Sequence, residues 1–231
     1  MKKWLEYQFK KQVKNFDWAN RVWPQPNLSD KLGLAFDRIV QDFESGKTYT
    51  PPYNVFMRED HIKRTSASAG EDVSENEYRS YLNEYFDLMK GQGHSYIDDL
   101  GVDEELIRNT FAETFDLQPD TVKFRVQVEV PGKYFIVHID RNRYKVWDQE
   151  PEMRYEKVKE QQQHKIFVTF LKDQELGQIF GFGKQTYNWK AGDTVTWEHQ
   201  SVPHYTANVG YHTNYMLVVT GMPKINGDSN A

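Results

Sequence analysis

The feature that most constrains the fold of this 231-residue chain is a strict alternation of apolar and polar side chains over residues 122–130. The apolar members are Val122, Phe124, Val126, Val128 and Val130. The polar members between them are Lys123, Arg125, Gln127 and Glu129. A period of two is typical of a β-strand whose two faces meet different surroundings, and such a strand must pair into a sheet.

The residues that follow predict further short strands, separated by turns. Turn signals occur at Pro131-Gly132, Gly181-Phe182-Gly183, Ala191-Gly192-Asp193 and Gly210. The predicted strands cover residues 134–139, 143–147, 165–171, 177–182, 185–189, 194–198, 204–208 and 215–220. A polar stretch at 149–164 predicts a loop. Eight or nine short strands of this kind indicate a sandwich, a jelly roll or a barrel.

The part of the chain before residue 119 has helical periodicity instead. Apolar residues recur at a spacing of three or four in residues 2–16, 30–45, 75–90 and 104–115, with Ser29 as a candidate N-cap of the second helix. We therefore expect a mainly β protein with α-helices. Residues 1–118 form a helical region packed on the core, residues 119–222 form the β core, and residues 223–231 form a flexible tail.

Composition excludes several classes of protein. The chain has no cysteine, so disulfides and zinc–thiolate sites are excluded. Its net charge of -5 argues against nucleic acid as a partner. No apolar run is long enough for a membrane span, and charged residues interrupt the N-terminus before a signal peptide could form. These patterns predict a soluble cytoplasmic protein and indicate no particular oligomeric state.

A candidate metal site comes from His138 and Asp140, which share one face of an extended stretch. An imidazole and a carboxylate are two of the three ligands of a facial triad that binds Fe(II). His204 opens a later predicted strand, and an antiparallel sheet can bring it beside the first pair. The pattern Pro203-His204-x-x-x-Asn208 favours His204 over His199 as the third ligand. Asn208 would lie on the same face as His204 and support the site, or satisfy a turn.

Several segments together resemble the double-stranded β-helix (jelly roll) of Fe(II)- and 2-oxoglutarate-dependent oxygenases. They are residues 131–140, 164–171, 177–180 and 189–193, and the run from Pro203 to Gly210. The resemblance is closest to the aspartyl/asparaginyl hydroxylase-like branch and covers roughly residues 120–221. It implies that His138, Asp140 and His204 bind Fe(II), with 2-oxoglutarate and O2 as cosubstrates. The implied reaction hydroxylates an unactivated C–H bond of a peptidyl residue or a small molecule.

The sequence departs from that branch at one position. An Arg that usually pairs with the far carboxylate of 2-oxoglutarate is replaced here by Asn214, which cannot make a charged bidentate contact. Lys165 is the first candidate for a substitute cation and Arg125 the second. Tyr134 and Gln127 could add neutral hydrogen bonds.

Two other functions stay open at this point. The stretch from Gly192 to Asn208 also resembles the second motif of cupins, which would give a metalloprotein that does not use 2-oxoglutarate. A non-catalytic β-sandwich for binding or assembly is the third reading, and the missing Arg supports both alternatives.

Overall fold

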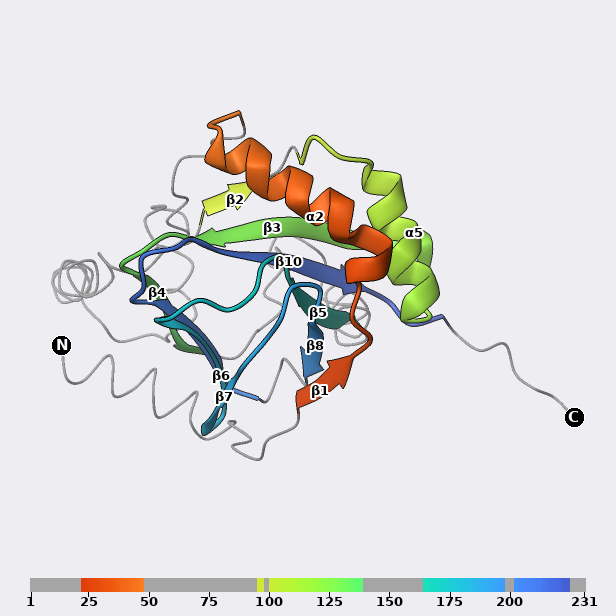
Figure 1. Ribbon diagram of the computed structural model, residues 1–231. Helices are drawn as coiled ribbons and strands as arrows, with labels where there is room; N and C mark the ends of the chain where they lie inside the picture. Colours follow the sequence, from red (N-terminus) through yellow and green to blue (C-terminus); the bar gives the residue numbers. More distant parts are fainter. Residues whose placement is uncertain (1–21, 48–94, 98–99, 139–163, 198–201, 225–231) are drawn as a thin grey trace, which may run out of the picture.

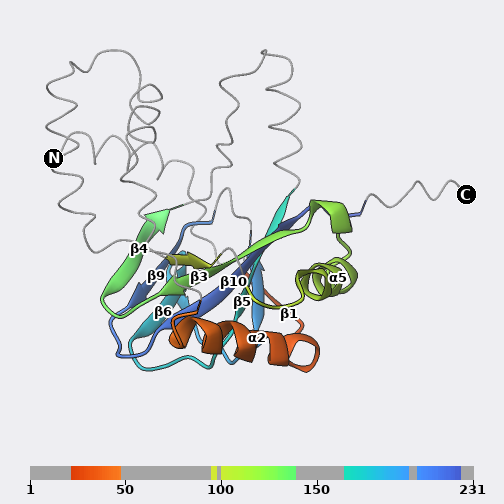
Figure 2. The ribbon, with the colours of Figure 1, turned by 90° about the horizontal axis from the view of Figure 1, so that it is seen from above.

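The computed structural model describes residues 22–47, 95–97, 100–138, 164–197 and 202–224. The helices are α2 (Ser29–Glu44) and α5 (Glu104–Thr114), with a 3-10 turn at Pro119–Thr121. The strands are β1 (Val22–Gln25), β2 (Ser95–Ile97), β3 (Lys123–Glu129), β4 (Lys133–His138), β5 (Lys165–Phe170), β6 (Gln178–Phe182), β7 (Gln185–Tyr187), β8 (Thr194–Trp197), β9 (His204–Asn208) and β10 (Asn214–Gly221). Figure 1 labels these helices and every strand but β9, which Figure 2 labels. The strands from β3 onward confirm the predicted ones to within a few residues. The predicted helices at 2–16 and 75–90, the strand at 143–147 and nearly all of the predicted loop lie outside the described residues.

The strands from β3 to β10 pair as a folded hairpin. β3 pairs with β10, β4 with β9, β5 with β8, and β6 with β7, each time antiparallel. Successive pairs fall in opposite sheets, because β10 also pairs with β5 in one sheet and β9 also pairs with β6 in the other. The strands thus form a two-stranded ribbon whose successive pairs lie alternately in two facing sheets. This is the strand order of a jelly roll.

Two short strands enlarge one of these sheets to the order β1-β8-β5-β10-β3-β2. β1 pairs with β8, and β2 pairs with β3. Both lie in the region predicted to be helical. Strand β1 carries Pro24, and a Pro is tolerated at such a sheet edge because no ladder partner needs its missing N–H. The region before residue 119 therefore contributes strands as well as helices.

Helices α2 and α5 cover the face of the six-stranded sheet that points away from the smaller sheet (Figures 1 and 2). Asp103 caps α5, since its carboxylate accepts hydrogen bonds from the backbone N–H groups of Glu105 and Leu106. The N-cap role predicted for Ser29 is wrong. Ser29 is the first residue of α2, and its hydroxyl donates to the carbonyl of Ala191, 2.8 Å away.

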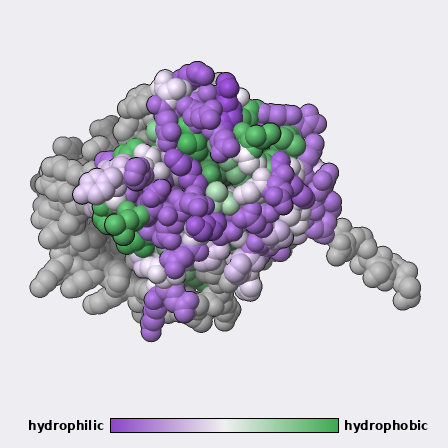
Figure 3. Space-filling view, viewed as in Figure 1, coloured by the Kyte–Doolittle hydropathy of each residue, from purple (hydrophilic) through white to green (hydrophobic). Residues whose placement is uncertain are grey.

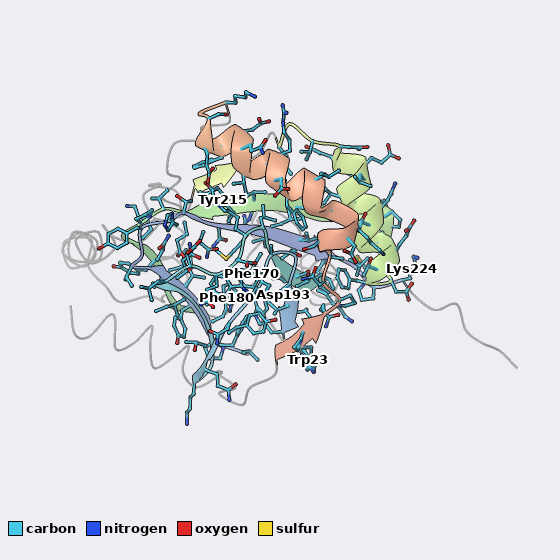
Figure 4. The ribbon with its side chains drawn as sticks, in the orientation of Figure 1. Trp23, Phe170, Phe180, Asp193, Tyr215 and Lys224 are labelled. Atoms are coloured by element: carbon cyan, nitrogen blue, oxygen red, sulfur yellow. The ribbon has the colours of Figure 1, made fainter. Side chains whose placement is uncertain are left out.

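The apolar core has two layers. The first lies between the helices and the six-stranded sheet, where Phe36, Ile107 and Phe111 pack against Val126 and Leu217. The second lies between the two sheets, and Figure 4 shows Phe170 and Phe180 there. Their rings meet edge to face at 5.3 Å between centroids, and Trp189 stacks on Phe170 at 4.3 Å. Aromatic rings thus fill the interior of the jelly roll.

The outside of the molecule is mostly hydrophilic in the view of Figure 3. In the described part of the chain, no helix has the length and apolarity needed to cross a membrane.

Candidate functional site

Two of the three predicted metal ligands lie on directly paired strands. The backbone of His138, at the end of β4, lies opposite that of His204, at the start of β9. The pairing contains a β-bulge, because two residues separate Phe135 from His138 whereas one residue separates their partners Thr206 and His204. In a regular strand, residues three apart such as Phe135 and His138 would occupy opposite faces. The bulge therefore sets the backbone register in which His138 lies opposite His204.

The His204 side chain lies inside the barrel, with 7% of its surface exposed. Its ring contacts the ring of Trp197 at 4.8 Å between centroids, and Trp197 also contacts Phe182 at 5.0 Å. Nδ1 of His204 lies 3.4 Å from the carbonyl oxygen of Val202. A donated Nδ1–H would fix the tautomer in which Nε2 carries the lone pair that a metal needs.

Asp140, the third predicted ligand, lies outside the described residues, as does the competing His199. Within the described ranges, no group of three or more His, Asp or Glu side chains is placed to hold a metal ion. The assignment of Asp140 therefore stays a prediction.

The polar face of β3 lines the interior of the barrel. Val126 and Val128 pack against the helices, so Arg125, Gln127 and Glu129 occupy the opposite, inner face. Register agrees, because Arg125, Gln127 and Glu129 pair with Val218, Met216 and Asn214 of β10, and Met216 belongs to the core between the sheets. Two predicted site residues, Arg125 and Gln127, thus lie on the same face of β3 as Glu129. Gln127 is half-buried, whereas Arg125, nearer the end of the barrel that holds the two histidines, is exposed.

Glu129 is the functional candidate that sequence reasoning missed. It is completely buried, and Oε1 accepts a hydrogen bond from the hydroxyl of Thr206. Its other oxygen, Oε2, makes no hydrogen bond to the part of the chain that the structure describes. Nδ2 of Asn214, directly across the strand pair, is likewise buried and has no hydrogen-bond partner of ordinary geometry among the described residues. The signal in the sequence was the polar face of a strand whose apolar face is already covered by helices.

Burial raises the pKa of Glu129 to about 7. Transfer from water to an apolar interior disfavours the charged carboxylate. The Thr206 hydroxyl and the nearby Asn214 amide favour the charged form and lower the pKa, but they offset only part of the effect of burial. Glu129 therefore exchanges its proton near neutral pH.

Asn208 has a structural role in this arrangement. Its side-chain amide donates to the backbone carbonyls of Glu129, 2.7 Å away, and His212, 2.8 Å away. Its carbonyl oxygen accepts from the N–H of Gly210. These contacts fix the turn after β9 to the end of β3, at the end of the barrel away from His204.

Two of the predicted cosubstrate contacts lie elsewhere. Lys165 is exposed, and it precedes the inward-facing Ile166 on β5, so it belongs to the outer face. Tyr134 pairs with Ala207, whose neighbours Thr206 and Asn208 face inward, so Tyr134 also belongs to an outer face. Neither residue shares the inner face with His204 and Asn214.

No protein-family model and no curated protein matches the chain. Similar solved structures include a Pseudomonas putida prolyl-4-hydroxylase, with 14% identity, 89% of this chain and 94% of that chain covered, and a TM-score of 0.47. Another is SnoN, a non-haem α-ketoglutarate-dependent epimerase from nogalamycin biosynthesis, with 10% identity, coverage of 94% and 83%, and a TM-score of 0.48. The cupin domain of Schizosaccharomyces pombe Cnp3 has 8% identity, coverage of 60% and 74%, and a TM-score of 0.32. Since these TM-scores lie below 0.5, the jelly-roll assignment rests on the strand order.

Proposed function

We propose that the protein is an Fe(II)- and 2-oxoglutarate-dependent oxygenase whose metal is held by His138, Asp140 and His204. The observation that carries the proposal is the pairing of His138 with His204 across β4 and β9. Residues directly opposite in an antiparallel pair have Cβ atoms about 4.5–5.5 Å apart. Two imidazoles at that separation can bind one metal ion, and Asp140 follows His138 by two residues.

The donor chemistry suits a non-haem iron. Two neutral imidazoles and one carboxylate form the facial set typical of Fe(II) oxygenases, which leaves positions for small-molecule ligands. The contact of His204 Nδ1 with the Val202 carbonyl supports a lone pair on Nε2. The rings of Trp197 and Phe182 beside His204 would keep bulk water away from the site.

The bound metal would supply the activation of O2. In the overall reaction, the substrate C–H, O2 and 2-oxoglutarate give the hydroxylated substrate, succinate and carbon dioxide. The protein's own residues hold the ligands in register, exclude water and orient the cosubstrate in the barrel. We propose a peptidyl residue or a small molecule as the substrate, in keeping with the aspartyl/asparaginyl hydroxylase-like resemblance.

A second candidate is a cupin-type metalloprotein that does not use 2-oxoglutarate. This alternative is favoured by the residues at the position where the related oxygenases have a cation for the far carboxylate of 2-oxoglutarate. Here that position holds Asn214 and the carboxyl of Glu129. This function keeps the metal ligands and changes only the cosubstrate.

Anaerobic titration separates these functions. Fe(II) followed by 2-oxoglutarate should produce a visible metal-to-ligand charge-transfer band, and His204→Ala should abolish both metal binding and the band. His212→Ala is the matched control, because His212 is exposed and contributes hydrogen bonds through its backbone carbonyl. Metal binding without the band would favour the cupin alternative. If the control and the His204 variant bind Fe(II) equally, the ligand assignment is refuted.

A further inference from the structure

We propose that Glu129, carrying a proton on its carboxyl group, and Asn214 form a neutral two-donor site that binds the far carboxylate of the keto-acid cosubstrate. This inference rests on the proposed function. It assigns to an acid and an amide the role that an arginine has in the oxygenases that the sequence resembles.

The first argument is the pair of unpartnered atoms. Oε2 of Glu129 and Nδ2 of Asn214 belong to residues directly opposite one another on β3 and β10, and within the described ranges neither atom makes a hydrogen bond of ordinary geometry, although the Asn214 amide lies close enough to favour the charged carboxylate. Leaving a buried polar atom unpaired destabilises the folded protein, so such atoms usually have a partner. A protonated Oε2 and the amide Nδ2 are two donors, and a carboxylate offers two acceptors. Thr206 holds the other oxygen of Glu129 and so orients the pair.

The second argument is reach. Thr206, which donates to Glu129, lies two residues after His204 on the same face of β9. Two residues of a strand span about 6.8 Å. A five-carbon dicarboxylate has a length of this order, so it could contact a metal at His204 with one end and the Glu129–Asn214 pair with the other.

The third argument is charge. Register places four other charged or titratable residues on the face of Glu129, namely the exposed Arg125 on β3, Lys133 and His138 on β4, and His204 on β9. On β10 and β6 the facing residues are the neutral Asn214, Met216 and Gln178. Burial outweighs the contacts that favour the charged form, and it brings the pKa of Glu129 to about 7. An ionised Glu129 would repel a carboxylate, so binding requires the proton.

Calorimetry on the Mn(II)-loaded full-length protein, without oxygen, tests this inference. 2-Oxoglutarate is compared with 2-oxobutyrate, which lacks the far carboxylate, so the ratio of their affinities isolates that group. In the wild type the preference for 2-oxoglutarate should fall by about thirtyfold from pH 6 to pH 8.5, because the fraction of protonated Glu129 falls in proportion. In Glu129→Gln the preference should not vary with pH, since an amide donates at every pH. Glu175→Gln, at an exposed residue, is the matched control and should behave as the wild type.

A second variant tests the other donor. Asn214→Ala should lower the preference at every pH by about tenfold or more, the value of a hydrogen bond to a charged group, while the pH dependence persists. The inference alone is overturned if both keto acids bind and the wild-type preference is independent of pH. It is also overturned if Arg125→Ala or Lys133→Ala abolishes the preference while Glu129→Gln leaves the wild-type profile unchanged. If neither keto acid binds although Mn(II) does, the proposed function fails and this inference fails with it.

Discussion

The buried carboxyl of Glu129 makes a prediction about stability that does not depend on the function. Its pKa is about 7 in the folded protein, against an ordinary value of 4.5 in a solvated chain. Between these two pH values the folded state keeps a proton that the unfolded state releases. Stability from this group is therefore fully present below pH 4.5 and is lost as the pH rises through about 7.

The size of the effect follows from the two pKa values. Each pKa unit corresponds to about 1.4 kcal/mol, so ionisation of Glu129 in the folded state should cost about 3 kcal/mol above pH 8. Glu129→Gln keeps the shape of the side chain and cannot ionise. Its free energy of unfolding, relative to the wild type, should rise by about 3 kcal/mol between pH 4.5 and pH 8.5.

Urea unfolding followed by tryptophan fluorescence, at half-unit steps across this range, measures both profiles. Other titrating groups are common to the two proteins, so they cancel in the difference. Glu175→Gln should give a profile parallel to the wild type, because Glu175 is exposed. Parallel profiles for Glu129→Gln and the wild type would refute the reasoning, since they would mean that Glu129 has the same pKa in both states.

Three other substitutions test the local structure. Gly192 has a φ of +80°, and a Cβ there would lie 2.6 Å from the backbone N of Ser29. Gly132 has a φ of +81°, but no atom of the described residues lies within 4 Å of its Cβ position. Gly132→Ala should therefore cost about 1–2 kcal/mol from backbone strain alone, and Gly192→Ala a further 1–3 kcal/mol or so from displacing the start of α2. Equal unfolding midpoints in urea would contradict this difference. Asp103→Ala removes the N-cap of α5 and should cost about 1 kcal/mol in the same assay; an unchanged midpoint would mean that the cap contributes nothing.

The strands of the core could be predicted because each carries its own periodicity and its own turns. Residues 122–130 show period two, and Gly132 and Gly192 mark turns in which the chain takes positive φ. β1 and β2 could not be predicted in this way. They have four and three residues, and their strand geometry comes from pairing with β8 and β3 rather than from a local pattern.

The candidate site was predictable only in part. Motif spacing selected His138 and His204, and register sets them opposite one another. The faces of Lys165 and Tyr134 could not be read from their strands, because alternation separates two faces without saying which one is inside. The β-bulge after Phe135 could not be predicted either. It shifts the register of β4 against β9, and no residue type in β4 indicates a bulge. Glu129 was passed over because a polar residue on an alternating strand is usually assigned to solvent.

The hairpin-like pairing of the strands has a consequence for how this protein responds to ligands. The two histidines belong to the β4–β9 pair. Among the described strands, this pair is nested inside the β3–β10 pair, and the strands from β5 to β8 lie between β4 and β9 in the sequence. An ion bound by both histidines would cross-link the two ends of a long segment of chain. Its binding energy would then resist the opening of the whole barrel, by about 2.7 kcal/mol when the ion is present at a hundred times its Kd. Thermal melting with and without added metal would thus report on occupancy even before any substrate is known.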